Sequence, residues 1–141
     1  SILSLDADKG FWVQIRPGHE AQNLKLVGRV PRQDQIMHMV KGMQLFGTPY
    51  PVEVNLDNAN LTANGATLPQ NADTIWYWDR AKQQYDYAWL STRAGFLGWR
   101  SATIQGAPPA TFSLNPGYGY WLQVREQYSE FTWTYHKPYT R

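Results

Sequence analysis

Cysteine is absent from the 141 residues of this chain, which excludes disulfide bridges and thiolate metal sites. Charge of either sign is sparse, with 13 Lys and Arg against 11 Asp and Glu and a net charge of +2. The basic residues form no cluster, and phosphate binding needs concentrated positive charge, so we expect no nucleic-acid partner. No apolar run approaches the roughly 20 residues that span a bilayer, so we expect no membrane span in this chain.

Motifs for metals, cofactors and catalysis are also missing. The stretch from Asp6 to Gly10 opens like a calcium loop, but no bidentate Glu follows at the required spacing. The three histidines share no metal-ligand spacing, and the G-x-S-x-G motif of serine hydrolases does not occur. We therefore expect no metal site, no cofactor and no catalytic residues, so that the protein is not an enzyme.

Aromatic side chains are abundant, with seven Trp, nine Tyr and five Phe beside eleven Gly and nine Pro. Aromatic residues favour strands, and Gly and Pro interrupt them. The composition predicts an all-β fold, a barrel or sandwich of about eight short strands with at most one short helix. That helix is expected at 56–62, after an N-cap at Asn55.

Period-two alternation of apolar and polar residues places the strands. The clearest element is a hairpin with two aromatic arms, 74–79 and 85–90, joined by a short polar linker. The other predicted strands are 10–16, 24–30, 42–47, 95–99, 118–125 and 131–135.

Thirteen residues near the start of the chain recur without a gap near its end: SLDADKGFWVQIR at 4–16 and SLNPGYGYWLQVR at 113–125. We expect a single domain over 1–141, in which 1–31 resemble the tail of a preceding repeat and 42–138 form a nearly complete repeat. The apolar faces of the two copies match, so we expect residues 10–30 to pair with strands of the body, in the same chain or in a swapped neighbour. The start at Ser1, without Met or signal peptide, favours a piece of a longer protein.

Several segments resemble an uncharacterised tandem repeat domain of large secreted bacterial proteins, whose motifs are G-x-x-L-V-G-x-P, V-Y-V-W-D and P-G-x-G-F-F-V. The matching segments are GMQLFGTPYPVEV at 42–54, TIWYWD at 74–79 and LNPGYGYWLQV at 114–124. The segment LKLVGRVP at 24–31 resembles the end of such a repeat. The resemblance implies repetition and an extracellular or cell-surface location, and it implies no activity.

Aromatic residues are the candidates for ligand binding. Trp78, Tyr87 and Trp89 belong to the hairpin, and Trp12 and Trp121 each begin a Trp-x-Gln-x-Arg triplet that occurs in both copies. A row of rings on one face of a sheet suits sugar stacking. Packing in the core or between repeats is the alternative that we favour, because aromatic residues commonly dominate core energetics.

The sequence therefore predicts a non-catalytic structural or adhesive repeat module, secreted or on the cell surface, whose partners are neighbouring repeats or surface glycans. The alternative is a carbohydrate-binding module that uses the aromatic residues as a stripe. A small extracellular hydrolase is a further alternative. The exposure of the Trp rings separates the first two hypotheses.

Overall fold

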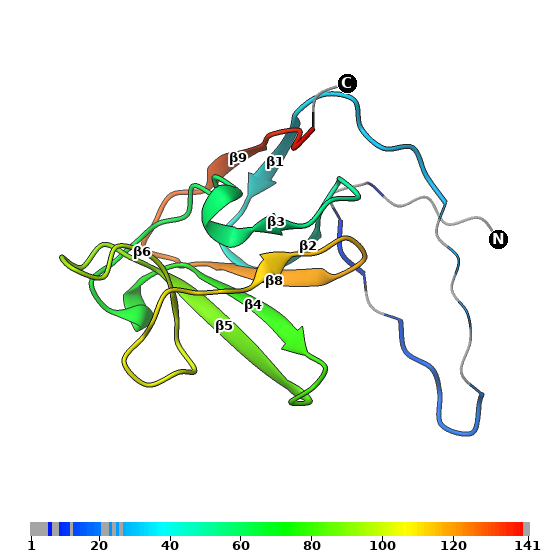
Figure 1. The fold of residues 1–141 in the computed structure, drawn as a ribbon, viewed down its shortest axis with the longest axis horizontal. Helices are drawn as coiled ribbons and strands as arrows, with labels where there is room; N and C mark the ends of the chain where they lie inside the picture. Colours follow the sequence, from blue (N-terminus) through cyan, green and yellow to red (C-terminus); the bar gives the residue numbers. More distant parts are fainter. Residues whose placement is uncertain are drawn as a thin grey trace.

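The structure, a computed structural model, describes residues 6, 9–11, 13–20, 23, 25 and 27–139. These residues form nine short strands in antiparallel sheets and two 3-10 turns, with no α-helix among them (Figure 1). The predicted all-β fold is confirmed. None of the described residues belongs to a helix long and apolar enough to cross a membrane.

The main sheet has five strands, in the order β2-β8-β4-β5-β6. The predicted aromatic hairpin forms its β4–β5 pair, and the strand from the second copy of the repeat, β8, lies between β2 and β4. The strands are β2 (Gly42–Gly47), β4 (Thr74–Asp79), β5 (Gln84–Ser91), β6 (Gly98–Ser101) and β8 (Gly119–Val124).

A second layer folds back over one face of this sheet. Strand β1 (Gln35–Met39) pairs with β9 (Phe131–Tyr135), so the β2–β8 ladder continues past two bends as the β1–β9 ladder. Trp133 of this layer is fully buried against Phe46 and donates its indole N–H to the carbonyl oxygen of Ala59 at 2.9 Å. A short third pair joins β3 (Val54–Asn55) to β7 (Ser113–Leu114).

The alternation in the sequence of β8 decides which side chains enter the core. Tyr120, Leu122 and Val124 are at most 1% exposed and belong to one hydrophobic cluster, as predicted. Trp121 and Gln123 point to the opposite face of the sheet, because successive side chains of a strand alternate.

The predicted short helix is a single 3-10 turn, η1 (Leu56–Asn58). Asn55 caps it as expected, since its side-chain oxygen accepts a hydrogen bond from the backbone N–H of Asp57 at 3.0 Å. A second 3-10 turn, η2 (Pro69–Asn71), begins at a proline in a segment expected to be a loop.

The predicted strands in the N-terminal segment are wrong for the residues that the structure describes. Phe11, Val13 and Ile15 are 38%, 57% and 45% exposed, and the described residues between 10 and 30 form no strand. One bridge joins Lys9 to Phe46 at the outer edge of β2, and the segment otherwise runs beside the body (Figure 1). Because β8 already occupies the position between β2 and β4, only the outer edge of β2 lies beside this segment, and the described residues pair with it at this bridge alone.

A buried carboxylate joins the centre of the sheet to the loop that precedes it. Asp73 is fully buried, and its oxygens accept hydrogen bonds from the backbone N–H of Asn64 at 2.8 Å, its side-chain amide at 2.7 Å and the backbone N–H of Arg125 at 2.8 Å. The backbone N–H of Asp73 returns a bond to the carbonyl oxygen of Asn64 at 2.9 Å.

Asp73→Ala should lower the free energy of unfolding by about 3–4 kcal/mol, because it leaves buried N–H groups without an acceptor. Urea denaturation followed by tryptophan fluorescence measures the change. Asp57→Ala, at an exposed position of η1, is the control and should change stability by less than about 0.5 kcal/mol. Equal losses in the two variants would contradict the role assigned to Asp73.

Candidate binding surface and pocket

Aromatic rings gather on the face of the main sheet that points away from the core. The register places Trp76 opposite both Tyr87 and Trp121, and Trp78 opposite Tyr85. These five residues are termed the outer aromatic face. Their rings are partly exposed, with Trp78 at 37% and Tyr85 at 36%, so the described chain does not cover this face completely.

The structure brings three of the five predicted site residues together on this face: Trp78, Tyr87 and Trp121. Trp89 points to the same side of β5 but is only 5% exposed, so its ring offers no free surface. Trp12 lies outside the described residues.

The rings on the outer aromatic face pack mainly on one another. Trp76 and Tyr87 stack with their centroids 4.0 Å apart and an interplanar angle of 13°. Trp78 meets Tyr85 edge to face at 5.0 Å. Each stacked ring therefore has one face covered by its partner, as in other cross-strand aromatic pairs.

The polar residues of the repeated triplet hold the sheet together. Gln123 accepts a hydrogen bond from the hydroxyl of Thr74 at 3.2 Å, and that hydroxyl accepts one from the indole of Trp76 at 2.8 Å. The guanidinium of Arg125 donates to the carbonyl oxygen of Ala72 at 2.9 Å. These bonds link β8 to β4 and to the segment before β4.

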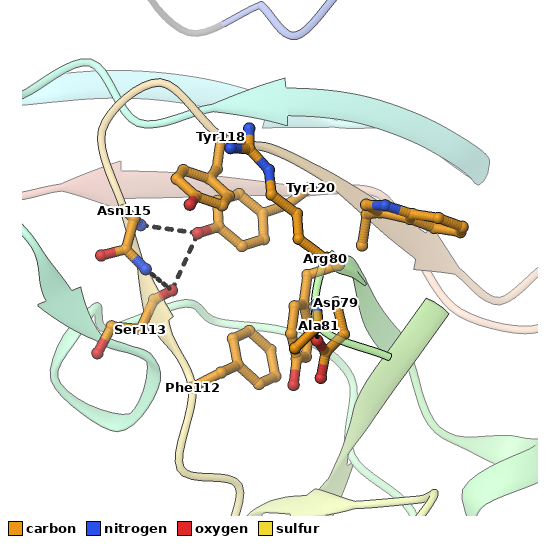
Figure 2. Close-up of a pocket in the computed structure, with 10 residues that line it drawn as sticks. Asp79, Arg80, Ala81, Phe112, Ser113, Asn115, Tyr118 and Tyr120 are labelled. Carbon is orange, nitrogen blue, oxygen red and sulfur yellow. Dashed lines mark hydrogen bonds between the residues drawn. The ribbon is translucent and has the colours of Figure 1, made fainter. Parts of the chain in front are cut away.

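A pocket of about 290 Å³ opens at the end of the sheet, between the β4–β5 turn and the β7–β8 turn (Figure 2). It is termed the end pocket. The two turns meet because β4 and β8 are antiparallel neighbours in which Tyr77 lies opposite Tyr120. The residues that line it include Tyr77, Arg80, Phe112, Asn115, Tyr118 and Tyr120.

Hydrogen bonds fix the shape of both turns. The Asp79 carboxylate accepts from the backbone N–H groups of Lys82 at 3.1 Å and Ala81 at 2.9 Å. The backbone N–H and then the side chain of Lys82 are the main causes that lower the pKa of Asp79. On the other side, the buried Tyr120 hydroxyl accepts from the backbone N–H of Asn115 at 2.7 Å and donates to the carbonyl oxygen of Ser113 at 2.9 Å (Figure 2). Burial raises the pKa of Tyr120.

A second, smaller cavity of about 200 Å³ adjoins β5 and contains the buried carboxylate of Asp86. Lys82 donates to this carboxylate, and the Tyr77 hydroxyl lies 3.3 Å from it. The bond from Lys82 lowers the pKa of Asp86, while burial and the nearby carboxylate raise the pKa of Tyr77. The three groups satisfy one another, which is typical of a structural network.

Sequence reasoning missed Arg80, Asn115, Tyr118 and Asp86. The only signal in the sequence was the turn composition Asn-Pro-Gly at 115–117 and the polar linker after Asp79, which does not show that the two turns meet. Among the described residues, no three His, Asp or Glu side chains gather to hold a metal ion. The segment from Asp6 to Gly10, which we expected not to bind calcium, lies partly outside the described residues, because Asp8 is not among them.

Searches of known protein families, curated proteins and solved structures find no match to the chain. The resemblance to a secreted tandem repeat therefore stays a prediction.

Lys82→Gln should destabilise the protein at pH 7 because it removes the cation that pairs with Asp86 and Asp79. The Lys82 ammonium is the largest cause that lowers the pKa of Asp86 below 3.8, and for Asp79 it comes second to the backbone N–H of Lys82, which the variant keeps. The stabilising effect of the pairing is present above pH 3.8 and is lost as the pH falls through the folded-state values. The difference in melting temperature between wild type and variant should therefore shrink between pH 5 and about pH 2.

Lys41→Gln, on an exposed bend, makes the same charge change and is the control. Its melting temperature should match that of the wild type at every pH. A Lys82→Gln deficit that stays constant down to pH 2 would show that lost packing, and not the ion pair, causes the effect.

Proposed function

We propose that this chain is a non-catalytic structural or adhesive repeat module of a secreted or cell-surface protein. The observation that carries the proposal is that most of the residues identical in the two copies hold the sheet together. In the second copy the identical residues are Ser113, Leu114, Gly119, Trp121, Gln123 and Arg125, of which Trp121 lies on the outer aromatic face.

The contacts of these residues support a scaffold role. Leu114 is fully buried, and Gly119 begins β8 opposite Gly47 of β2. Gln123 and Arg125 make the bonds to β4 and the preceding segment described above. The residues that are identical in the two copies are therefore residues of β7, of β8 and of the position directly after β8, as expected for a tandem array of similar sheets.

The outer aromatic face is the proposed contact surface. Partly exposed Trp and Tyr rings that the described chain does not cover are typical of interaction sites. The mutual stacking of Trp76 and Tyr87 leaves no broad flat platform for a sugar ring. This geometry favours packing against a neighbouring module over the carbohydrate stripe on this face.

The triple variant Tyr120→Phe, Leu122→Val, Val124→Ile tests whether the first copy fits the place of the second. It gives β8 the inward residues of the first copy, Phe11, Val13 and Ile15. Leu→Val and Val→Ile balance in volume, so the expected loss of about 1–2 kcal/mol comes mainly from the missing hydroxyl and its two hydrogen bonds. Thermal and urea unfolding measure it.

A matched variant that carries Thr in place of Val at position 122 is the control. It has nearly the same shape but buries a hydroxyl in the core, so it should be less stable than the triple variant by about 1–3 kcal/mol. A triple variant that is molten, or no more stable than this control, would contradict the interpretation of the two segments as copies of one repeat.

A further inference from the structure

The floor of the end pocket is carbon surface. The rings of Tyr77 and Phe112 lie 4.4 Å apart, and Phe112 and Tyr120 are parallel within 13° at 6.4 Å. The hydroxyls of both tyrosines are occupied, Tyr77 by Asp86 and Tyr120 by the β7–β8 turn. The floor therefore suits the apolar face of a ring more than a polar group.

Arg80, a cation, lies at the mouth of the pocket. The Cζ atom of Arg80 lies 4.9 Å from the centroid of the Tyr118 ring, and Tyr118 is 41% exposed (Figure 2). Among the described residues, no carboxylate lies within ion-pair distance of Arg80. The adjacent carboxylate of Asp79 is held by Lys82, 3.1 Å away, and by turn N–H groups.

This arrangement leaves the N–H donors of the guanidinium available to a ligand. Stacking on Tyr118 restricts the plane of the guanidinium, and such a planar fork matches the two oxygens of a carboxylate. The side chains of Ser113 and Asn115 add polar groups to the same rim. The volume, about 290 Å³, is just below that of pockets for drug-sized ligands, so one sugar-sized ring fits.

The two copies of the repeat differ at these positions. Where the second copy has Asn115, Tyr118 and Tyr120, the first has Asp6, Lys9 and Phe11. The scaffold residues are identical between the copies, but the ring under Arg80 is replaced by a lysine. The end pocket is therefore not a requirement of the repeated fold, and its chemistry belongs to this unit.

We propose that the end pocket binds a uronic acid residue of a polysaccharide. The apolar face of the sugar ring lies on Tyr77 and Phe112, and its carboxylate pairs with Arg80. A uronic acid would then be the class of ligand that the adhesive module binds. This proposal rests on the proposed function only because an adhesive module needs a binding site. It uses none of the substitutions that test the repeat, so the two proposals can fail separately.

Isothermal titration with a trimer of galacturonic acid tests the site, and the methyl-esterified trimer is the matched neutral probe. The acid should bind at least tenfold more tightly than the ester, because only the carboxylate forms charge-assisted bonds with Arg80. Arg80→Gln should weaken binding of the acid about tenfold and leave the ester unaffected. Tyr118→Ala should weaken binding, while Tyr118→Phe, which keeps the ring, should restore it.

Arg93→Gln is the control for net charge, since Arg93 also stacks on a ring, at 5.0 Å from the centroid of Phe96, but does not line the end pocket. It should bind the acid like the wild type, and all variants should melt at the wild-type temperature. Equal affinity for acid and ester, equal weakening by Arg80→Gln and Arg93→Gln, or no binding at millimolar concentration would each overturn the proposal.

Discussion

The buried carboxylate of Asp73 is the interaction on which the rest of the structure depends. A carboxylate removed from water is costly unless hydrogen bonds satisfy it, so the chain must bring donors to this point. One donor is the backbone N–H of Arg125, the first residue after β8, and two more come from Asn64. Asp73 directly precedes β4, so these bonds fix β8 against β4 and set the position where the chain bends toward β9.

The sequence predicted those strands whose own residues are aromatic or alternate between apolar and polar. The β4–β5 hairpin has aromatic residues on both arms, and β8 and β9 alternate clearly. Strand β1 was missed, although Met37 and Met39 are buried between exposed neighbours, because methionine is a weak strand signal. The N-terminal copy was assigned to a strand by its alternating pattern, and this was wrong, because its described residues form no strand. Alternation cannot show that another segment already holds the matching position in the sheet.

For the candidate sites too, the sequence predicted what depends on local pattern and missed what depends on long-range contacts. Alternation alone predicts that Trp78, Tyr87 and Trp89 share one face of the hairpin, and the register confirms it. It does not predict which of them is covered, so the burial of Trp89 appears only in the folded chain. The end pocket joins the turn after β4 to the turn before β8. Those turns are distant in sequence, and their meeting depends on long-range pairing that no local pattern contains.

The fold requires the residues within β8, whereas it does not require the side chain of Tyr118 in the turn before β8. Its inward residues and its bonds to Thr74 and Ala72 determine how the sheet assembles, whereas Tyr118 precedes the strand and projects from a turn. A change at Tyr118 does not touch the Asp73 hydrogen bonds at the other end of β8. Replacing Tyr118 by lysine, as in the first copy, therefore changes the chemistry of the pocket mouth while the central pairing is preserved. Under the proposed repeat architecture, the turn at the end of the sheet is the place where binding chemistry would differ between units.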